Sequence, residues 1–160
     1  MKSILVIVFL FLSVFSFSQI EDSLFTIVKN VKVNALESEA SRIEFLENMH
    51  DIDQGIRQTF IGIEQTYGYK SPEYNNGVRK WKEMDSCLFF KTIEYLNLYS
   101  YPTKEMGGKA GGTPQLIFHH AWNPEAVEIK IDYFHLLYQS FKSNIINQGS
   151  FWLYLYRLYY

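Results

Sequence analysis

The chain has 160 residues, of which 48% are hydrophobic and 20% charged, and its formal net charge is −2. This composition is typical of a globular domain rather than a disordered chain, and a chain of this length suits one domain with a substantial core. The mixed, nearly balanced charge argues against a nucleic-acid-binding surface. Cys87 is the single cysteine, which excludes an internal disulfide framework, so packing must hold the fold together.

The N-terminus predicts a secretory signal peptide over residues 1–18. Lys2 supplies a positive charge, residues 4–15 are almost all apolar, and Ser16-Phe17-Ser18 offers small residues for cleavage. The apolar run is too short for a comfortable membrane span, and no stop-transfer charges follow it. We expect an exported protein, periplasmic or extracellular, with no membrane span in the mature chain. An uncleaved N-terminal anchor is the alternative.

After this segment the sequence predicts a lead-in over residues 19–35 and one helical domain over residues 36–160. Apolar residues recur at intervals of three, four and seven from Leu36 to Tyr67, which is one stripe of a long helix. Pro72 and Asn76-Gly77 predict a break, and a second stripe then runs from Val78 to Tyr99.

The remainder predicts shorter helices. The glycines of "GGKAGG" predict a loop, Thr113 an N-cap, and Pro114 the first residue of a short helix. Asn123-Pro124 is expected to end that helix, and one further helix is expected over residues 127–145, before a break at Gly149-Ser150. No segment alternates with period two, so the predicted fold is an all-α, single-domain bundle of about four to five helices.

Several polar residues fall on the apolar stripes. Asp53 lies on the buried stripe of the first long helix, with Arg57 one turn later as a ready ion-pair partner. Asp85 lies inside the stripe of the second long helix. Buried carboxylates are costly unless they are paired, so both require a partner.

The histidine doublet supplies a further polar group. Neighbouring residues on a helix point about 100° apart, so His119 and His120 do not face one centre together. His120 shares its side with apolar residues and is expected to point inward. We therefore expect Asp53, Arg57, Asp85 and His120, hereafter the polar cluster, to meet in space, with His50 nearby.

Two interpretations of the polar cluster remain open. It is a buried ion-pair network that sets the packing of the helices, or a site of general acid–base chemistry with His120, Asp53 and Asp85 as candidate catalytic residues. Helical metal sites usually present ligand pairs three or four residues apart, and only His50 and Asp53 match loosely, so no metal or cofactor is expected.

Several segments of the chain resemble an uncharacterised bacterial family known only as domain of unknown function number 6624. "MHDIDQGIR" is similar to that family's Asp-Gln-x-x-Arg segment. The matching positions in this segment are Asp53, Gln54 and Arg57. In "EMDSCLFFKTIEYLNLYSYPTKEMGG" they are Asp85, Pro102 and Gly107, and in "LIFHHAWNPE" they are His120 and Ala121. The departures are Leu88, Tyr101, His119 and Trp122, and the chain ends soon after Tyr156-Arg157, where the family continues.

The resemblance implies one site containing Asp53, Gln54, Arg57, Asp85 and His120, but no reaction. Gln54, Arg57 and His50 are the candidate ligand-binding residues. Altogether the sequence predicts a non-enzymatic binding or structural module with an unidentified protein or small-molecule partner. The alternative is a hydrolase-type enzyme that uses His120 with Asp53 or Asp85, with or without a metal.

Overall fold

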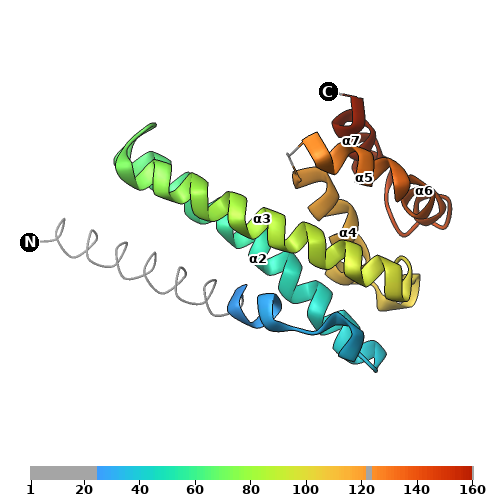
Figure 1. Ribbon diagram of the computed structural model, residues 1–160. Coiled ribbons are helices and arrows are strands. Elements are labelled where there is room, and N and C mark those ends of the chain that lie inside the picture. The colour runs from blue at the N-terminus through green and yellow to red at the C-terminus, as the bar shows by residue number, and fades with distance from the viewer. Residues whose placement is uncertain (1–24, 122–123, 160) are drawn as a thin grey trace, which may run out of the picture.

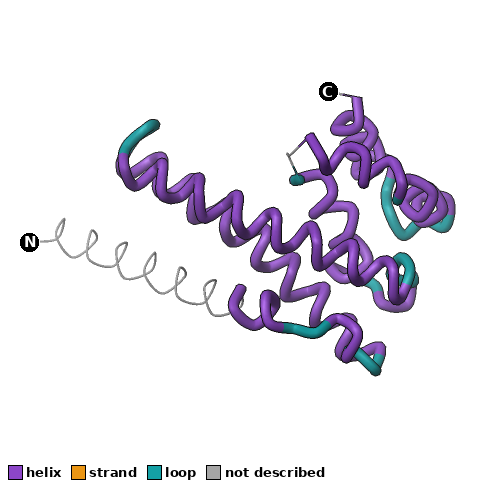
Figure 2. The backbone as a smooth tube through the Cα atoms, viewed as in Figure 1, coloured by secondary structure: helices purple, strands orange, loops and turns teal. Residues whose placement is uncertain are grey.

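The computed structural model describes residues 25–121 and 124–159, and within these ranges it contains helices and loops and no strand (Figures 1 and 2). The all-α prediction is confirmed. The expected four to five helices are too few, because the described residues hold six complete α-helices, two 3-10 turns and a helical stretch at residues 25–30. No helix within these ranges is long and apolar enough to cross a membrane.

Two long helices form the frame of the molecule. They are α2 (Glu39–Tyr67) and α3 (Pro72–Tyr99), which lie side by side and run in opposite directions (Figure 1). A Ser38–Ser41 capping box starts α2, and Ser71 caps the backbone N–H of Tyr74 at the start of α3. Both caps satisfy backbone N–H groups that a helix start leaves unpaired.

The predicted turn at Asn76-Gly77 is wrong, because both residues lie inside α3. The reversal is made earlier, at Gly68 and Lys70, which adopt φ values of 84° and 67°. A Cβ atom built on Gly77 would lie 3.3 Å from the side chains of both Phe60 and Ile63. The glycine therefore lets α3 approach α2 closely, and this packing offsets its poor helix propensity.

The glycine-rich segment is also helical rather than a loop. After η2 (Lys104–Met106), α4 (Gly108–His120) begins, so Thr113 and Pro114 lie within it. The hydroxyl of Thr113 donates to the carbonyl of Lys109 within α4 and to the carbonyl of Leu46 on α2. Thr113 thus joins two helices instead of capping one. Figure 1 shows α4 packed against the α2–α3 pair.

Three short helices complete the described chain: α5 (Pro124–Asp132), α6 (Phe134–Lys142) and α7 (Gln148–Tyr159). The single helix expected over residues 127–145 is broken at Tyr133. Gly149 and Ser150 lie in the first turn of α7, where Asn147 accepts a hydrogen bond from the Ser150 N–H. The expected break at Asn123 lies outside the described residues, although α5 does begin at Pro124.

One buried aromatic residue joins these helices to the frame. Phe118 of α4 is fully buried, and its ring centroid lies 5.4 Å from that of Phe89 on α3 and 6.5 Å from that of Tyr154 on α7. Tyr133 contacts the same ring at 5.8 Å. Phe118 therefore lies where the frame, α4 and the C-terminal helices meet.

Lys130 is an unusual member of this core, because its side chain is 1% exposed. Its ammonium donates to the carbonyl of Ala121 at the end of α4, over 2.6 Å. A helix C-terminus has unpaired carbonyls and partial negative charge, so it is a favourable place for a buried cation. Burial, and to a smaller extent Arg157, lowers the pKa of Lys130 to about 8.

Candidate functional site

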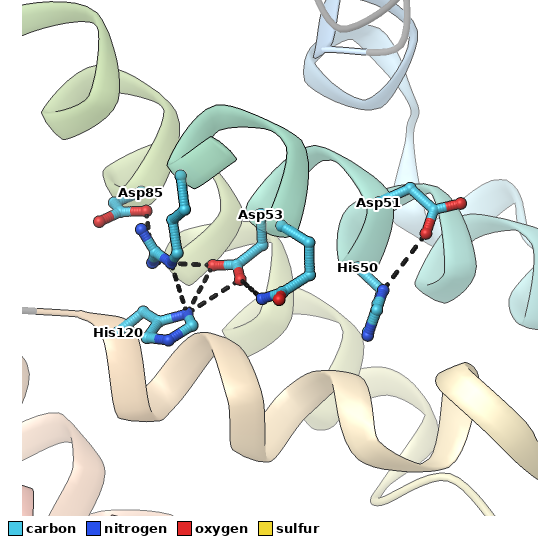
Figure 3. A network of polar contacts seen from close by, with 7 residues as sticks. His50, Asp51, Asp53, Asp85 and His120 are labelled. Atoms are coloured by element: carbon cyan, nitrogen blue, oxygen red, sulfur yellow. Dashed lines mark hydrogen bonds and ion pairs between the residues drawn. The ribbon is translucent and has the colours of Figure 1, made fainter. Parts of the chain in front are cut away.

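Arg57 lies at the centre of the polar cluster and bonds to side chains on three helices. Figure 3 labels these partners, Asp53, Asp85 and His120. Its Nη2 donates to Asp53 Oδ1 on α2 over 2.9 Å and to Asp85 Oδ1 on α3 over 3.1 Å. Its Nε lies 2.9 Å from Nδ1 of His120 at the end of α4. One guanidinium therefore holds together three side chains that are far apart in the sequence.

Asp53 is the most buried member of the polar cluster, with 1% of its surface exposed. Both of its carboxylate oxygens lie 2.9 Å from His120 Nδ1, and Gln54 Nε2 donates to Oδ2 over 2.7 Å. The spacing of Asp53 and Arg57, one helical turn apart, brings their side chains together. Every hydrogen-bond partner described for this carboxylate is thus a nitrogen atom.

Asp85 occupies the outer side of the same guanidinium. Burial raises the pKa of Asp85 to about 6, and the nearby Asp53 charge adds to this, whereas Arg57 opposes it. Burial is the largest of these causes, because it removes water from the charged form. The pairing with Arg57 therefore compensates only part of the cost of ionising Asp85.

Sequence reasoning missed Trp81, which is also part of this site. The Arg57 guanidinium lies 5.1 Å from the centroid of the Trp81 ring, a cation–π contact. Trp81 lies one turn before Asp85 on α3, so the same face of that helix presents both groups. This spacing, an aromatic residue four positions from a buried acid, was the available signal.

His50 lies apart from the polar cluster, contrary to the expectation that it is nearby (Figure 3). Its Nδ1 is 3.3 Å from Asp51 Oδ1, and Asp51 also pairs with Lys109 of α4 over 2.6 Å. The Asp51–Lys109 pair joins α2 and α4 at the surface, whereas the His50–Asp51 pair lies within α2. The His50 ring is directed to the neighbouring Asp51 instead of to Asp53, although residues three apart share a helix face.

The two histidines of the doublet have different surroundings. His120 faces Asp53 and Arg57, whereas the His119 pKa is lowered mainly by burial and then by the neighbouring His120. The ring centroids are 5.0 Å apart with an interplanar angle of 51°. The two neighbouring rings therefore have different partners.

The donor set of the site is one guanidinium, one imidazole, two carboxylates and an amide. Within the described parts of the chain, no group of three or more His, Cys, Asp or Glu residues is placed to hold a metal ion. The Asp53–His120 contact is the arrangement by which a carboxylate orients an imidazole for proton transfer. Comparisons with family models, with curated proteins and with solved structures gave no match to this chain.

Proposed function

We propose that the chain is an exported, non-enzymatic helical module in which the polar cluster acts as a structural clamp on α2, α3 and α4. The observation that carries this proposal is that Arg57 bonds to Asp53, Asp85 and His120, one partner on each helix. A residue that serves only as a local ion pair within α2 would not need the other two contacts.

The cost of burying the cluster supports the clamp. Asp53 is 1% exposed, and the side chains of Arg57 and Asp85 are each 15% exposed. Buried ions lose hydration that only close, well-oriented partners repay, so the network favours the one helix arrangement in which all partners meet. The clamp would then hold the module in shape while other surfaces bind a protein or small-molecule partner.

A hydrolase-type activity is the second candidate, and one specific contact favours it. Asp53 faces Nδ1 of His120, which leaves Nε2 as the nitrogen available for proton transfer. In such a mechanism Asp53 orients the ring and His120 acts as general base toward a water molecule. Asp85 would then be a second carboxylate beside the reacting centre.

One set of variants separates the two functions. We expect Asp53→Asn and His120→Asn to lower the free energy of unfolding by about 1.5–3 kcal/mol, because each weakens a buried hydrogen bond to a charged group. We expect the wild type to hydrolyse no ester, phosphoester or amide above background. His50→Asn is the control, since it lies outside the cluster. Turnover in the wild type that both cluster variants abolish and the control retains would establish the enzyme instead.

The family resemblance is also a proposal. Its matched site positions are Asp53, Gln54, Arg57, Asp85 and His120, and these five side chains contact one another across three helices. Residues that form one site in a family must lie close together, so the contacts support the resemblance. They do not bear on any reaction.

Export has its own test, because residues 1–24 lie outside the described part of the chain. We propose cleavage by signal peptidase after Ser18. When the full chain is expressed in a bacterium, we expect protein in the periplasm or medium whose N-terminal residue is Gln19 by mass spectrometry. A membrane-bound product that retains Met1 would support the uncleaved anchor instead.

A further inference from the structure

Helix α7 carries apolar side chains on both of its faces. Phe151 and Tyr154 are 7% and 0% exposed, and their rings pack toward α6 and α4. The opposite face presents Trp152, Tyr156 and Tyr159, which are 61%, 56% and 87% exposed. Their spacing of four and three residues places them on one stripe of the helix. A helix at the surface of a globular protein usually presents charged and polar side chains outward, so this face is an exception.

The exposed apolar surface extends beyond this stripe. Leu153 is 50% exposed, and Tyr138 of α6 is 44% exposed, with its ring centroid 6.1 Å from that of Phe151. Figure 1 shows α7 and the C-terminus at the edge of the molecule, away from the α2–α3 frame. We call this surface the aromatic face, and its residues are Tyr138, Trp152, Leu153, Tyr156 and Tyr159.

The charge of this end of the chain is as uneven as its polarity. Residues 133–160 contain Lys142 and Arg157 and no Asp or Glu, whereas the whole chain has a net charge of −2. All 17 acidic residues therefore precede residue 133. Lys142 is exposed on α6, and Arg157 follows Tyr156 on α7. A negatively charged partner is thus attracted to the end of the molecule that carries the aromatic face and is repelled by the remainder.

From these observations we propose that the aromatic face binds the surface of a membrane that contains anionic lipids, with α7 lying among the headgroups. Tryptophan and tyrosine side chains favour this level of a bilayer, because their rings are apolar and their N–H or O–H groups stay hydrated. A helix in this position buries its apolar face, and nearby basic residues add attraction to anionic headgroups. The proposal goes beyond the polar cluster and holds whether or not that cluster is a clamp.

A second copy of the chain is the competing occupant, and both size and charge argue against it. The twelve residues of α7 form a helix about 18 Å long and about 10 Å wide, so one face covers roughly 180 Å². A stable protein interface buries about 800 Å² on each partner, and Tyr138 does not supply the difference. Two copies that met through this face would also bring like charges together, whereas an anionic lipid surface complements them.

The experiment measures how much protein sediments with lipid vesicles. One set of vesicles contains equal parts of phosphatidylglycerol and phosphatidylcholine, and the other contains phosphatidylcholine alone. Every protein is expressed from the full chain and purified in the same way, so that the N-termini match. The variants are Trp152→Gln combined with Leu153→Gln, then Lys142→Gln, and Phe90→Gln as the control. Phe90 is an aromatic residue of α3 that is 52% exposed, so its replacement removes a similar side chain outside the aromatic face.

We expect the wild type to bind the anionic vesicles about 10- to 30-fold more tightly than the neutral ones, because each basic residue near the surface contributes about fivefold. The double variant should bind the anionic vesicles at least about 10-fold more weakly, because it removes most of the apolar area that enters the bilayer. Lys142→Gln should weaken the same binding by about fivefold. Phe90→Gln should bind as the wild type does.

Three results would overturn the proposal. They are no binding of the wild type to either vesicle, binding that the double variant retains, and a dimer in analytical ultracentrifugation that the double variant abolishes while vesicles bind nothing. The second would place the contact elsewhere on the chain, and the third would assign the aromatic face to a second copy. Urea unfolding checks that the double variant is folded. If it is not, Lys142→Gln carries the test, and unchanged binding by that variant contradicts the proposal.

Discussion

Replacing Arg57 with methionine should lower the free energy of unfolding by about 3–5 kcal/mol at pH 7, because it leaves buried carboxylates without their counter-ion. Methionine keeps an apolar stem against Trp81, so the loss reports the charge and hydrogen bonds rather than packing. Arg79→Met is the matched control. Arg79 lies on the exposed side of α3 and bonds only the side chain of Asn76 among the contacts described, so we expect a change within about 0.5 kcal/mol.

A triple variant shows whether pairing or shape matters at this site. Asp53→Leu, Arg57→Met and Asp85→Leu together remove every permanent charge from the polar cluster. Replacing a whole buried ion network with apolar residues is often neutral or stabilising, so we expect the triple variant to regain most of the stability that Arg57→Met loses. Urea unfolding measures both effects. Equal destabilisation by Arg57→Met and Arg79→Met would show that Arg57 does not stabilise the packing of α2, α3 and α4.

The frame and the buried acids could be predicted because their signal is long and regular. Each of the two long stripes extends over many helical turns, and this is enough to define a face on which Asp53 is out of place. The i,i+4 spacing then named Arg57 as its partner. The contacts of Asp85 and His120 followed only from the costs of burying polar groups, and the structure brings both to Arg57.

The glycine-rich segments could not be predicted, because local preference and tertiary packing disagree there. Glycine disfavours helix by about 1 kcal/mol relative to alanine. Gly77 lies where α3 packs close to α2, and a Cβ atom built on the buried Gly111 would lie 3.5 Å from the side chain of Ile145. A contact of this kind depends on residues distant in the sequence, so no local pattern reveals it.

The prediction of one helix over residues 127–145 failed for a different reason. In the helix expected over residues 127–145 the spacing of apolar residues puts Ile131 and Tyr138 on the core side, but they are 57% and 44% exposed, whereas Leu137 is fully buried. The predicted stripe continues through residue 133, where the helix breaks, so one period does not describe the buried faces of both α5 and α6. The break at Tyr133 carries no glycine or proline signal. It brings the Tyr133 ring against Phe118, a contact that depends on the tertiary fold.

Truncating Phe118 should be as damaging as removing Arg57, for an apolar reason. Phe118→Ala removes a fully buried ring that contacts Phe89, Tyr133 and Tyr154, and it leaves a cavity between α4 and its neighbours. Large-to-small changes of this kind cost about 3–5 kcal/mol. Phe90→Ala is the control. Phe90 follows Phe89 on α3 and is 52% exposed, so its truncation should lower the free energy of unfolding far less.

The location of the loss is as informative as its size. Phe118 joins the α2–α3 frame to the C-terminal helices, so its removal should loosen residues 124–159 before it loosens the frame. Hydrogen exchange measured by mass spectrometry should therefore show faster exchange in α5 to α7 of Phe118→Ala, with smaller changes in α2 and α3. In Arg57→Met, exchange should instead become faster mainly where α2, α3 and α4 contact one another. Identical exchange patterns in the two variants would mean that the frame and the C-terminal helices unfold as one unit.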